Sequence, residues 1–282
     1  MSLKDVLAIL ASADADEAAI AASERLAERF GAHVGAAFLT PLPDEPLAYE
    51  PTAVAGVWAE LLGRARLQAQ AEKQRLEARL ARAGRAIELR AAEALLRDLG
   101  RIAAVHARYA DLAVVTRPAD DDAGALRADV VEGVLFHSGR PLLIVPPDWP
   151  ADREIGLRPV LAWDASREAT RALSEADVFL DTCEQATVVT VDAKPRAWGH
   201  GEAPGFNIAA HLARRGVTAS VRNVETASGE GTTEALLKAC RDAGGDLMVM
   251  GGYHSPRLLE LVFGGATRDL LSTADVPLLM AH

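Results

Sequence analysis

Short apolar runs alternate with amphipathic stretches along the whole chain. The runs predict strands, in the first half at Val6–Leu10, Val34–Leu39, Ile87–Ala91, Leu112–Val115 and Leu142–Val145, and in the second at Val160–Trp163, Thr187–Val191, Ala219–Val224, Leu247–Met250 and Leu278–Met280. The stretches between them predict helices near residues 16–30, 53–83, 93–109, 127–138, 168–182, 205–215, 232–243 and 265–273. Strands that are apolar throughout and separated by helices favour parallel pairing with both sheet faces covered. We therefore expect a doubly wound α/β fold.

The chain also repeats itself. Three segments recur in the same order: VLAILAS and VLAWDAS, DLAVV and DLMVM, RPLLIVP and VPLLMAH. Such a repeat indicates two copies of one unit. The proline-rich segment 146–159 interrupts both patterns and predicts a linker. We expect one domain over residues 1–147 and a second over residues 157–282.

The longest helical pattern covers residues 52–83. Glu60 and Arg64 form a favourable i,i+4 pair on it, and one apolar stripe is predicted to contain Val54, Trp58, Leu61, Ala65, Ala69, Leu76 and Leu80. This segment is either a crossover helix packed on the sheet or a helix whose outer end covers a pocket or a partner subunit.

Composition and charge narrow the class of protein. Of 282 residues, 30 are Lys or Arg and 40 are Asp or Glu, a formal charge of −10 that argues against binding nucleic acid over a broad surface. Cys183 and Cys240 suggest neither a disulfide framework nor zinc, and we expect both to be buried and inert. The N-terminal apolar run is too short for a signal peptide or a membrane span. We therefore expect a soluble, cytoplasmic protein.

Candidate chemistry follows two strands of the second half. Ligands of open parallel sheets bind beyond the carboxyl ends of the strands, where Asp164 and the pair Gly251–Gly252 lie. Ser255 and Pro256 predict a short helix over Arg257–Phe263, and the last helix opens with Gly264, Gly265, Ala266 and Thr267. A glycine turn that enters a helix suits phosphate, although turn geometry alone is the commoner reason for such glycines. Asp164 is either a ligand for a purine amine or ribose, or a cap of the helix that follows it.

The segment VLAWDAS, the glycine pattern and the terminal VPLLMAH together resemble the universal stress protein family in its tandem form. The family's fold implies the flavodoxin-type strand order 3-2-1-4-5, which leaves Leu142–Val145 and Leu278–Met280 at edges that can pair within the chain. The resemblance also implies a homodimer, for which the long helix is a candidate surface. The nucleotide site of the family implies adenine contacts from Asp164, a backbone contact near Val191, and phosphate contacts from Gly251, Gly252, His254, Gly264, Gly265, Ala266 and Thr267.

The sequence departs from the family pattern at several of these positions. His254 stands where the family has its second glycine, so its ring fills phosphate space or donates a hydrogen bond to phosphate. Gly265 replaces a hydroxyl residue. In the first half, Leu10 replaces the aspartate and Asp120, Asp121 and Asp122 form an acidic loop, which we expect to be solvated. The first copy therefore has the features of a degenerate site.

The leading functional hypothesis is a stress-response sensor that binds ATP or another adenine nucleotide in the second domain, with Mg²⁺ possible alongside the nucleotide. A second hypothesis is an interaction module without a nucleotide. The third, slow ATP hydrolysis or autophosphorylation at Ser166 or Thr267, has no visible general base, and the full P-loop pattern is absent. We assign no catalytic residue and no metal ligand.

Overall fold

The computed structural model describes residues 2–44, 51–84, 86–121, 123–195, 200–252 and 265–282, and within these it leaves out the side chains of residues 51–55 and 265–268. The first half runs through β1 (Asp5–Leu10), α1 (Glu17–Phe30), β2 (His33–Leu42), α2 (Pro51–Leu80), β3 (Glu88–Leu95), α3 (Leu96–Ala107), β4 (Leu112–Thr116), α4 (Gly124–His137) and β5 (Leu142–Val145). The second half runs through β6 (Pro159–Ala162), α5 (Arg167–Glu175), α6 (Asp177–Leu180), β7 (Ala186–Val191), α7 (Phe206–Arg214), β8 (Ala219–Val224), α8 (Thr232–Asp242), β9 (Leu247–Gly251), α9 (Gly265–Thr273) and β10 (Leu278–Ala281).

All ten of these strands form one sheet, in the order β3-β2-β1-β4-β5-β10-β9-β6-β7-β8. Each half has the predicted order 3-2-1-4-5, and its strands are parallel. The two halves join through an antiparallel pair, in which Leu279 of β10 lies opposite Leu143 of β5. The predicted pairing of these two segments within one chain is thereby confirmed.

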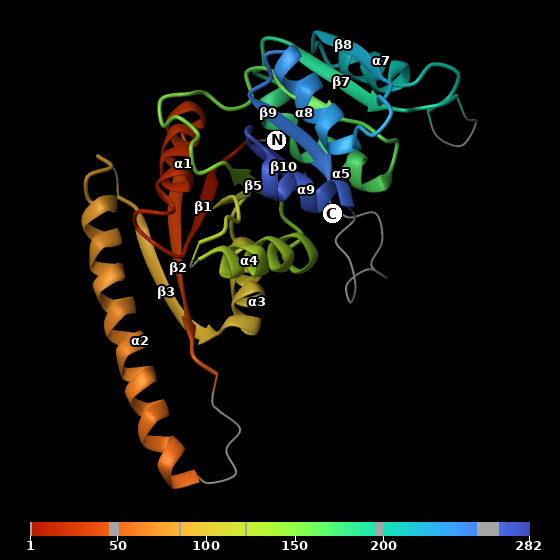
Figure 1. The fold of residues 1–282 in the computed structure, drawn as a ribbon. Coiled ribbons are helices and arrows are strands. Elements are labelled where there is room, and N and C mark those ends of the chain that lie inside the picture. Colours follow the sequence, from red (N-terminus) through yellow and green to blue (C-terminus); the bar gives the residue numbers. More distant parts are fainter. Residues whose placement is uncertain (1, 45–50, 85, 122, 196–199, 253–264) are drawn as a thin grey trace.

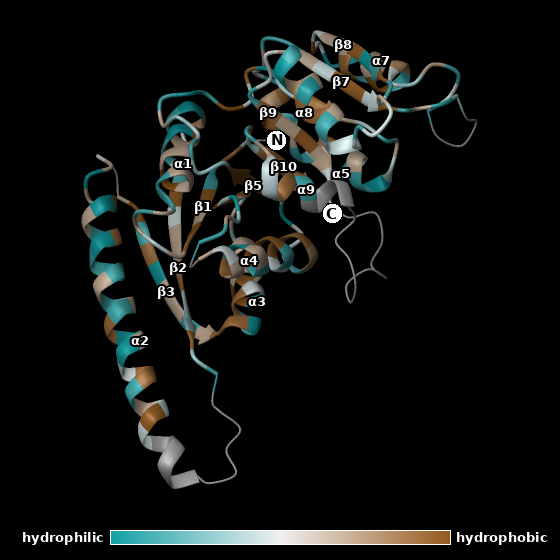
Figure 2. Cartoon of the chain, in the orientation of Figure 1, coloured by the Kyte–Doolittle hydropathy of each residue, from teal (hydrophilic) through white to brown (hydrophobic). Residues whose placement is uncertain are grey.

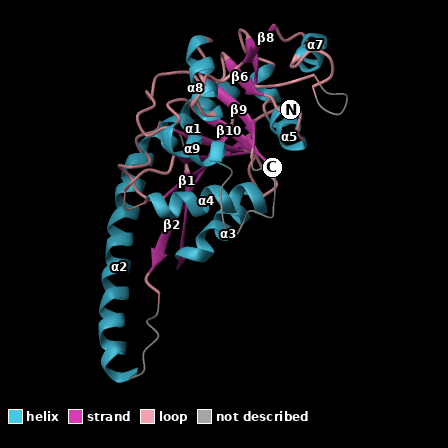
Figure 3. Ribbon diagram, turned by 45° about the vertical axis from the view of Figure 1, so that its right-hand side comes forward, coloured by secondary structure: helices cyan, strands magenta, loops and turns pink. Residues whose placement is uncertain are grey.

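Right-handed crossovers place the helices of the first half in two layers. Figure 1 shows α1 and α2 on one side of its sheet and α3 and α4 on the other. The α3 and α4 helices meet at two glycines, because a Cβ on Gly133 would lie 2.1 Å from the carbonyl oxygen of Gly100. The hydrophobic core between the layers includes every residue of β5 at 0% exposure. Figure 3, coloured by secondary structure, shows the sheet continuing into the second half.

We expected every strand to be apolar along its whole length, and the two edge strands are not. β3 and β8 lie at the ends of the sheet, and many of their side chains are exposed. Charged edge residues such as Arg90 and Arg222 are typical of edges that must not pair with other chains. The sheet interior alone therefore follows the continuous apolar pattern.

Two predicted elements have different bounds, and one predicted stripe has an exposed member. The helix expected over 168–182 is two short helices, with the single turn residue Ala176 (φ −80°, ψ −2°) between α5 and α6. The strand expected over 87–91 continues to Leu95, which lies beside Leu42 of β2. On α2, Leu61 is 49% exposed rather than part of the buried stripe, whereas Ala69, Leu76 and Leu80 are buried as predicted.

The paired motifs DLAVV and DLMVM begin with aspartates that have one structural role. Asp111 accepts hydrogen bonds from the backbone N–H groups of Lys4 and Asp5, which enter β1. Asp246 accepts three, from Gly156, Leu157 and Arg158, which enter β6. Burial nevertheless raises the pKa of Asp246, because desolvation outweighs these three donors. The repeat therefore preserves a way of fixing the start of each central strand.

Contacts between α1 and the second half hold the two units together. Arg29 donates to the carbonyl of Ile155 at 2.7 Å and to Oγ1 of Thr182 at 2.6 Å. Beside it, the rings of Phe30 and Phe179 meet edge to face with centroids 5.9 Å apart. Among the residues that the structure describes, no helix is both long and apolar enough to cross a membrane.

Candidate functional site

The fold creates two equivalent crevices. In each half the strand order reverses between the first and fourth strands, and the carboxyl ends of these strands border the place where doubly wound proteins bind ligands. In the first half the crevice lies beyond β1 and β4, and in the second beyond β6 and β9. Because β5 and β10 are antiparallel, the two crevices face opposite ends of the sheet.

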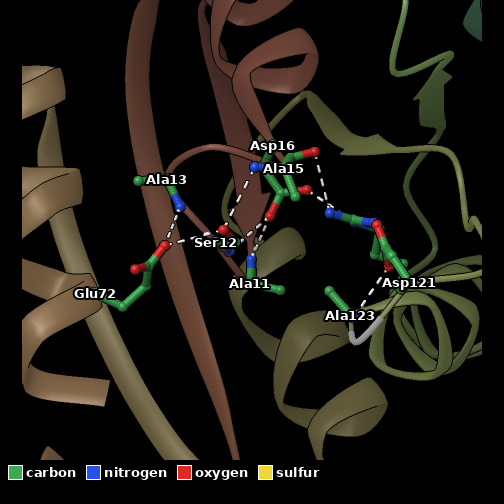
Figure 4. A network of polar contacts seen from close by, with 9 residues as sticks. Ala11, Ser12, Ala13, Ala15, Asp16, Glu72, Asp121 and Ala123 are labelled. Carbon is green, nitrogen blue, oxygen red and sulfur yellow. Dashed lines mark hydrogen bonds and ion pairs between the residues drawn. The ribbon is translucent and has the colours of Figure 1, made fainter. Parts of the chain in front are cut away.

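The buried side chain of Arg127 joins the loops that border the first crevice, and Figure 4 shows its partners Ala15, Asp16 and Asp121 together. Nε of Arg127 donates to Oδ1 of Asp16 at 2.9 Å, Nη1 donates to Asp121 at 2.8 Å, and Nη2 donates to the carbonyl of Ala15 at 3.1 Å. The side chains of Arg127 and Asp16 are 2% and 0% exposed. A buried charge is tolerated only when it is paired and hydrogen-bonded. Here the guanidinium comes from α4, and its acceptors come from the loop after β1 and the loop after β4. Asp121, expected in a solvated loop, is therefore an ion-pair partner.

The backbone N–H groups at the end of β1 are also occupied. Those of Ala11 and Ser12 donate to Oδ2 of Asp16 at 2.6 and 2.9 Å. The N–H of Ala13 and the hydroxyl of Ser12 donate to Oε1 of Glu72, at 2.6 and 2.9 Å. Glu72 belongs to α2, so a carboxylate from the long helix occupies donors that would otherwise suit an anion.

Sequence reasoning missed Arg127, Asp16 and Glu72, although one signal was present. Arg127, Val130, Val131 and Val134 have the spacing of a single helix stripe, and all four are buried. An arginine that begins a buried apolar stripe requires acidic partners that are themselves close to it. No comparable signal in the sequence links Glu72 to the loop that it contacts.

The second crevice has a different border. Asp164 lies two residues after the end of β6 and is exposed, and its Oδ1 accepts the backbone N–H of Ser166 at 3.0 Å. Between them, Ala165 has a left-handed backbone (φ 61°). The cap of α5 is Ser166 rather than Asp164, because the Ser166 hydroxyl accepts the N–H of Ala169 at 3.0 Å. One carboxylate oxygen of Asp164 thus fixes the turn, at the edge where a ligand would lie.

Val191 ends β7 next to this turn. Ala162 of β6 lies opposite Val189 of β7, and the N–H of Trp163 donates to the carbonyl of Val189 at 2.8 Å, so Asp164 and Val191 each follow this last register pair by two residues. After Val191 the chain turns at Asp192 (φ 49°), whose carboxylate accepts hydrogen bonds from the N–H and the hydroxyl of Thr226. The structure therefore brings the predicted contacts Asp164 and Val191 to one edge.

The two glycines at the end of β9 have structural roles of their own. A Cβ on Gly251 would lie 2.5 Å from the backbone nitrogen of Ala169, so glycine is needed here for α5 to pack on β9. The N–H of Gly252 donates to the carbonyl of Ala281 at 2.8 Å, and its own carbonyl lies 2.9 Å from Nδ1 of His282. We expected both glycines to offer backbone N–H groups to a ligand, and the N–H of Gly252 is already used by β10.

Several predicted site residues lie outside what the structure describes. His254, Gly264 and the helix expected over 257–263 are among the residues left out. Gly265, Ala266 and Thr267 form the first turn of α9 as predicted, without described side chains. Among the described residues, no group of three or more His, Cys, Asp or Glu side chains is arranged to hold a metal ion.

Comparison with known proteins identifies the architecture. No family model and no curated protein sequence matches the chain. Among solved structures, a universal stress protein from Archaeoglobus fulgidus matches with a TM-score of 0.68 at 18% identity, over 99% of this chain and 96% of that one. The chain has the tandem universal stress protein fold.

Two further solved structures have the same fold. A universal stress protein from Pseudomonas aeruginosa, described as putative, matches with a TM-score of 0.55 at 14% identity, over 99% of this chain and 93% of that one. A protein of unknown function from the same species matches equally well in TM-score at 12% identity, over 99% and 92%. The universal stress protein fold therefore extends over both halves, and at these identities it is the fold that is shared.

Proposed function

We propose that this protein is a stress-response sensor that binds ATP or another adenine nucleotide in its second domain, residues 157–282, without efficient catalysis. The nucleotide would lie beyond β6 and β9. Asp164 would accept hydrogen bonds from the adenine amine or the ribose, the backbone at Val191 would contact the base, and the first turn of α9 would bind phosphate. Mg²⁺ would accompany the nucleotide rather than occupy a site built by the protein, and we propose the cytoplasm as its location.

The observation that carries this proposal is the contrast between the two crevices. In the first, Arg127 and Asp16 are buried against each other, and carboxylates occupy the donors after β1. In the second crevice, Asp164 of the equivalent turn is exposed, and one of its carboxylate oxygens accepts the backbone N–H of Ser166. The first domain, residues 1–147, would then be a scaffold that has replaced a ligand with its own side chains.

Calorimetric titration with ATP and Mg²⁺, together with thermal unfolding, tests the proposal. At nucleotide concentrations of about ten times Kd, binding stabilises the folded protein by roughly 1.4 kcal/mol. Asp164→Ala should weaken binding by at least about tenfold, because it removes a hydrogen-bonding partner of the base. Asp14→Ala is the matched control, since Asp14 is exposed in the corresponding turn of the first half.

Two results would contradict the proposal in different ways. If wild-type protein shows no response to millimolar nucleotide, the protein is an interaction module. If Asp164→Ala binds as tightly as wild type, the nucleotide lies elsewhere. Turnover of ATP by highly purified protein, abolished in Asp164→Ala, would show an enzyme instead of a sensor.

A further inference from the structure

The long helix α2 has a heptad stripe whose C-terminal members face its own domain. Successive positions alternate between spacings of four and three residues, the pattern that keeps one seam on one side of a helix. These side chains are buried or half-buried: Trp58, Leu62, Ala65, Ala69, Glu72 and Leu76. At the C-terminal end of this inward stripe, Glu72 accepts hydrogen bonds from the loop after β1 and Leu76 joins the hydrophobic core, so this part of the stripe holds α2 on the first half.

A second stripe with the same spacing lies on the solvent side of α2. We call it the outward stripe, and it consists of Val57, Glu60, Arg64, Leu67 and Ala71, all exposed. Val57 is 59% exposed and Leu67 is 70% exposed, among the most exposed large apolar side chains described. Figure 1 shows the N-terminal end of α2 reaching beyond the sheet, and in Figure 2 apolar patches appear on that part of the helix.

The order of residues along the outward stripe is complementary to itself. If a second copy of α2 lies antiparallel, with the two-fold axis at the level of Leu62, Val57 faces Leu67 of the second copy. Glu60 then faces Arg64 of the second copy, and each of these contacts occurs twice, as a two-fold interface requires. Apolar pairs thus flank two ion pairs at the centre. Within one chain Glu60 and Arg64 already form an ion pair, so the four charges would alternate in sign.

The charges also select one orientation and one register. Parallel helices would place Glu60 against Glu60 and Arg64 against Arg64, which is repulsive. A shift by one heptad would leave the central charges opposite apolar or small residues. A polar pair at one position of a heptad seam fixes register and orientation in this way, at some cost in stability.

We propose that the outward stripe is a homodimerisation surface on which a second copy of the chain packs its own α2 antiparallel. The occupant is a second copy because, when two copies of the stripe lie antiparallel, apolar residues face apolar residues and Glu60 faces Arg64. The contact involves one helix from each chain, so we expect a reversible dimer with a concentration-dependent population rather than an obligate one. The surface is separate from both crevices, and dimerisation does not depend on nucleotide.

Charge reversal on the full-length protein tests the central ion pairs by sedimentation velocity. Glu60→Arg and Arg64→Glu each create like charges across the axis, so each variant alone should dimerise at least tenfold more weakly than wild type. An equimolar mixture of the two variants restores opposite charges across the axis and should associate within about threefold of wild type. Glu77→Arg is the matched control, because it removes the Lys73–Glu77 i,i+4 pair of α2 away from the outward stripe.

Cysteine crosslinking tests the register. In a Cys183→Ala background, a mixture of Val57→Cys and Leu67→Cys chains should form a disulfide-linked dimer, and either chain alone should form much less. Residues 57 and 67 are about 15 Å apart along one helix, too far for a disulfide between equivalent positions at this register. A wild-type protein that stays monomeric at high concentration would overturn the proposal. A dimer that tolerates both single reversals would also overturn it, and would place the interface elsewhere, such as the edge strand β8.

Discussion

Nε of Arg127 lies 2.9 Å from Oδ1 of Asp16, and neither side chain is accessible to solvent. The two residues are far apart in sequence, one before α1 and the other in the first turn of α4. Their ion pair therefore ties together the two loops that border the first crevice. Asp121 and the carbonyl of Ala15 complete the hydrogen bonding of the guanidinium.

Breaking this pair should be costly. Arg127→Met leaves Asp16 buried without its cation, and the free energy of unfolding should fall by about 3–5 kcal/mol. Urea denaturation measures the change. In the double variant Asp16→Asn/Arg127→Met the loss should be smaller than the sum of the two single losses, because one interaction is removed twice. Additive losses would show that the two side chains contribute independently.

Glu72 should control how firmly α2 is held. Glu72→Ala removes the acceptor for the N–H of Ala13 and the hydroxyl of Ser12, and it should lower the free energy of unfolding by about 1.5–3 kcal/mol. Hydrogen exchange should accelerate in the C-terminal half of α2. Glu77→Ala, which removes only an exposed ion pair, should change stability by less than about 0.5 kcal/mol. Equal effects from the two variants would contradict a docking role for Glu72.

The two cysteines should differ in reactivity. Burial raises the pKa of Cys240 to about 12, so at pH 8 roughly one thiol in ten thousand is ionised. Burial also raises the pKa of Cys183, which is only half-buried, contrary to the expectation that both thiols are buried. Because the thiolate is the reactive form, alkylation by iodoacetamide should be slow at pH 8 and accelerate as the pH rises. Mass spectrometry should show Cys183 modified first, and modification of Cys240 at an equal rate would contradict its burial.

The fold was predictable because its signals are local and occur twice. The apolar runs gave the strands, and the recurrence of DLAVV as DLMVM identified two units with one plan. The structure supplies the physical reason for this recurrence, since Asp111 and Asp246 both accept the backbone N–H groups that enter the central strands. The break at Ala176 was not predictable, because the amphipathic pattern continues across it.

The sites were less predictable because they depend on distant partners. Glu72 reaches Ala13 from a helix that follows it in the chain only after α1 and β2, and Gly252 donates its N–H to the strand that contains Ala281. Local patterns identify which residues can donate or accept. They do not identify which of those groups already form hydrogen bonds with distant parts of the chain.

The antiparallel pair of β5 and β10 sets an order of events during synthesis. β10 follows the other nine strands that the structure describes, yet it occupies the middle of the sheet. While the ribosome is still translating the second half, β5 is an uncovered edge made of four apolar residues, and such edges recruit other strands. The halves of this protein can therefore close into one sheet only when the final strand emerges, and until then β5 needs protection from premature association.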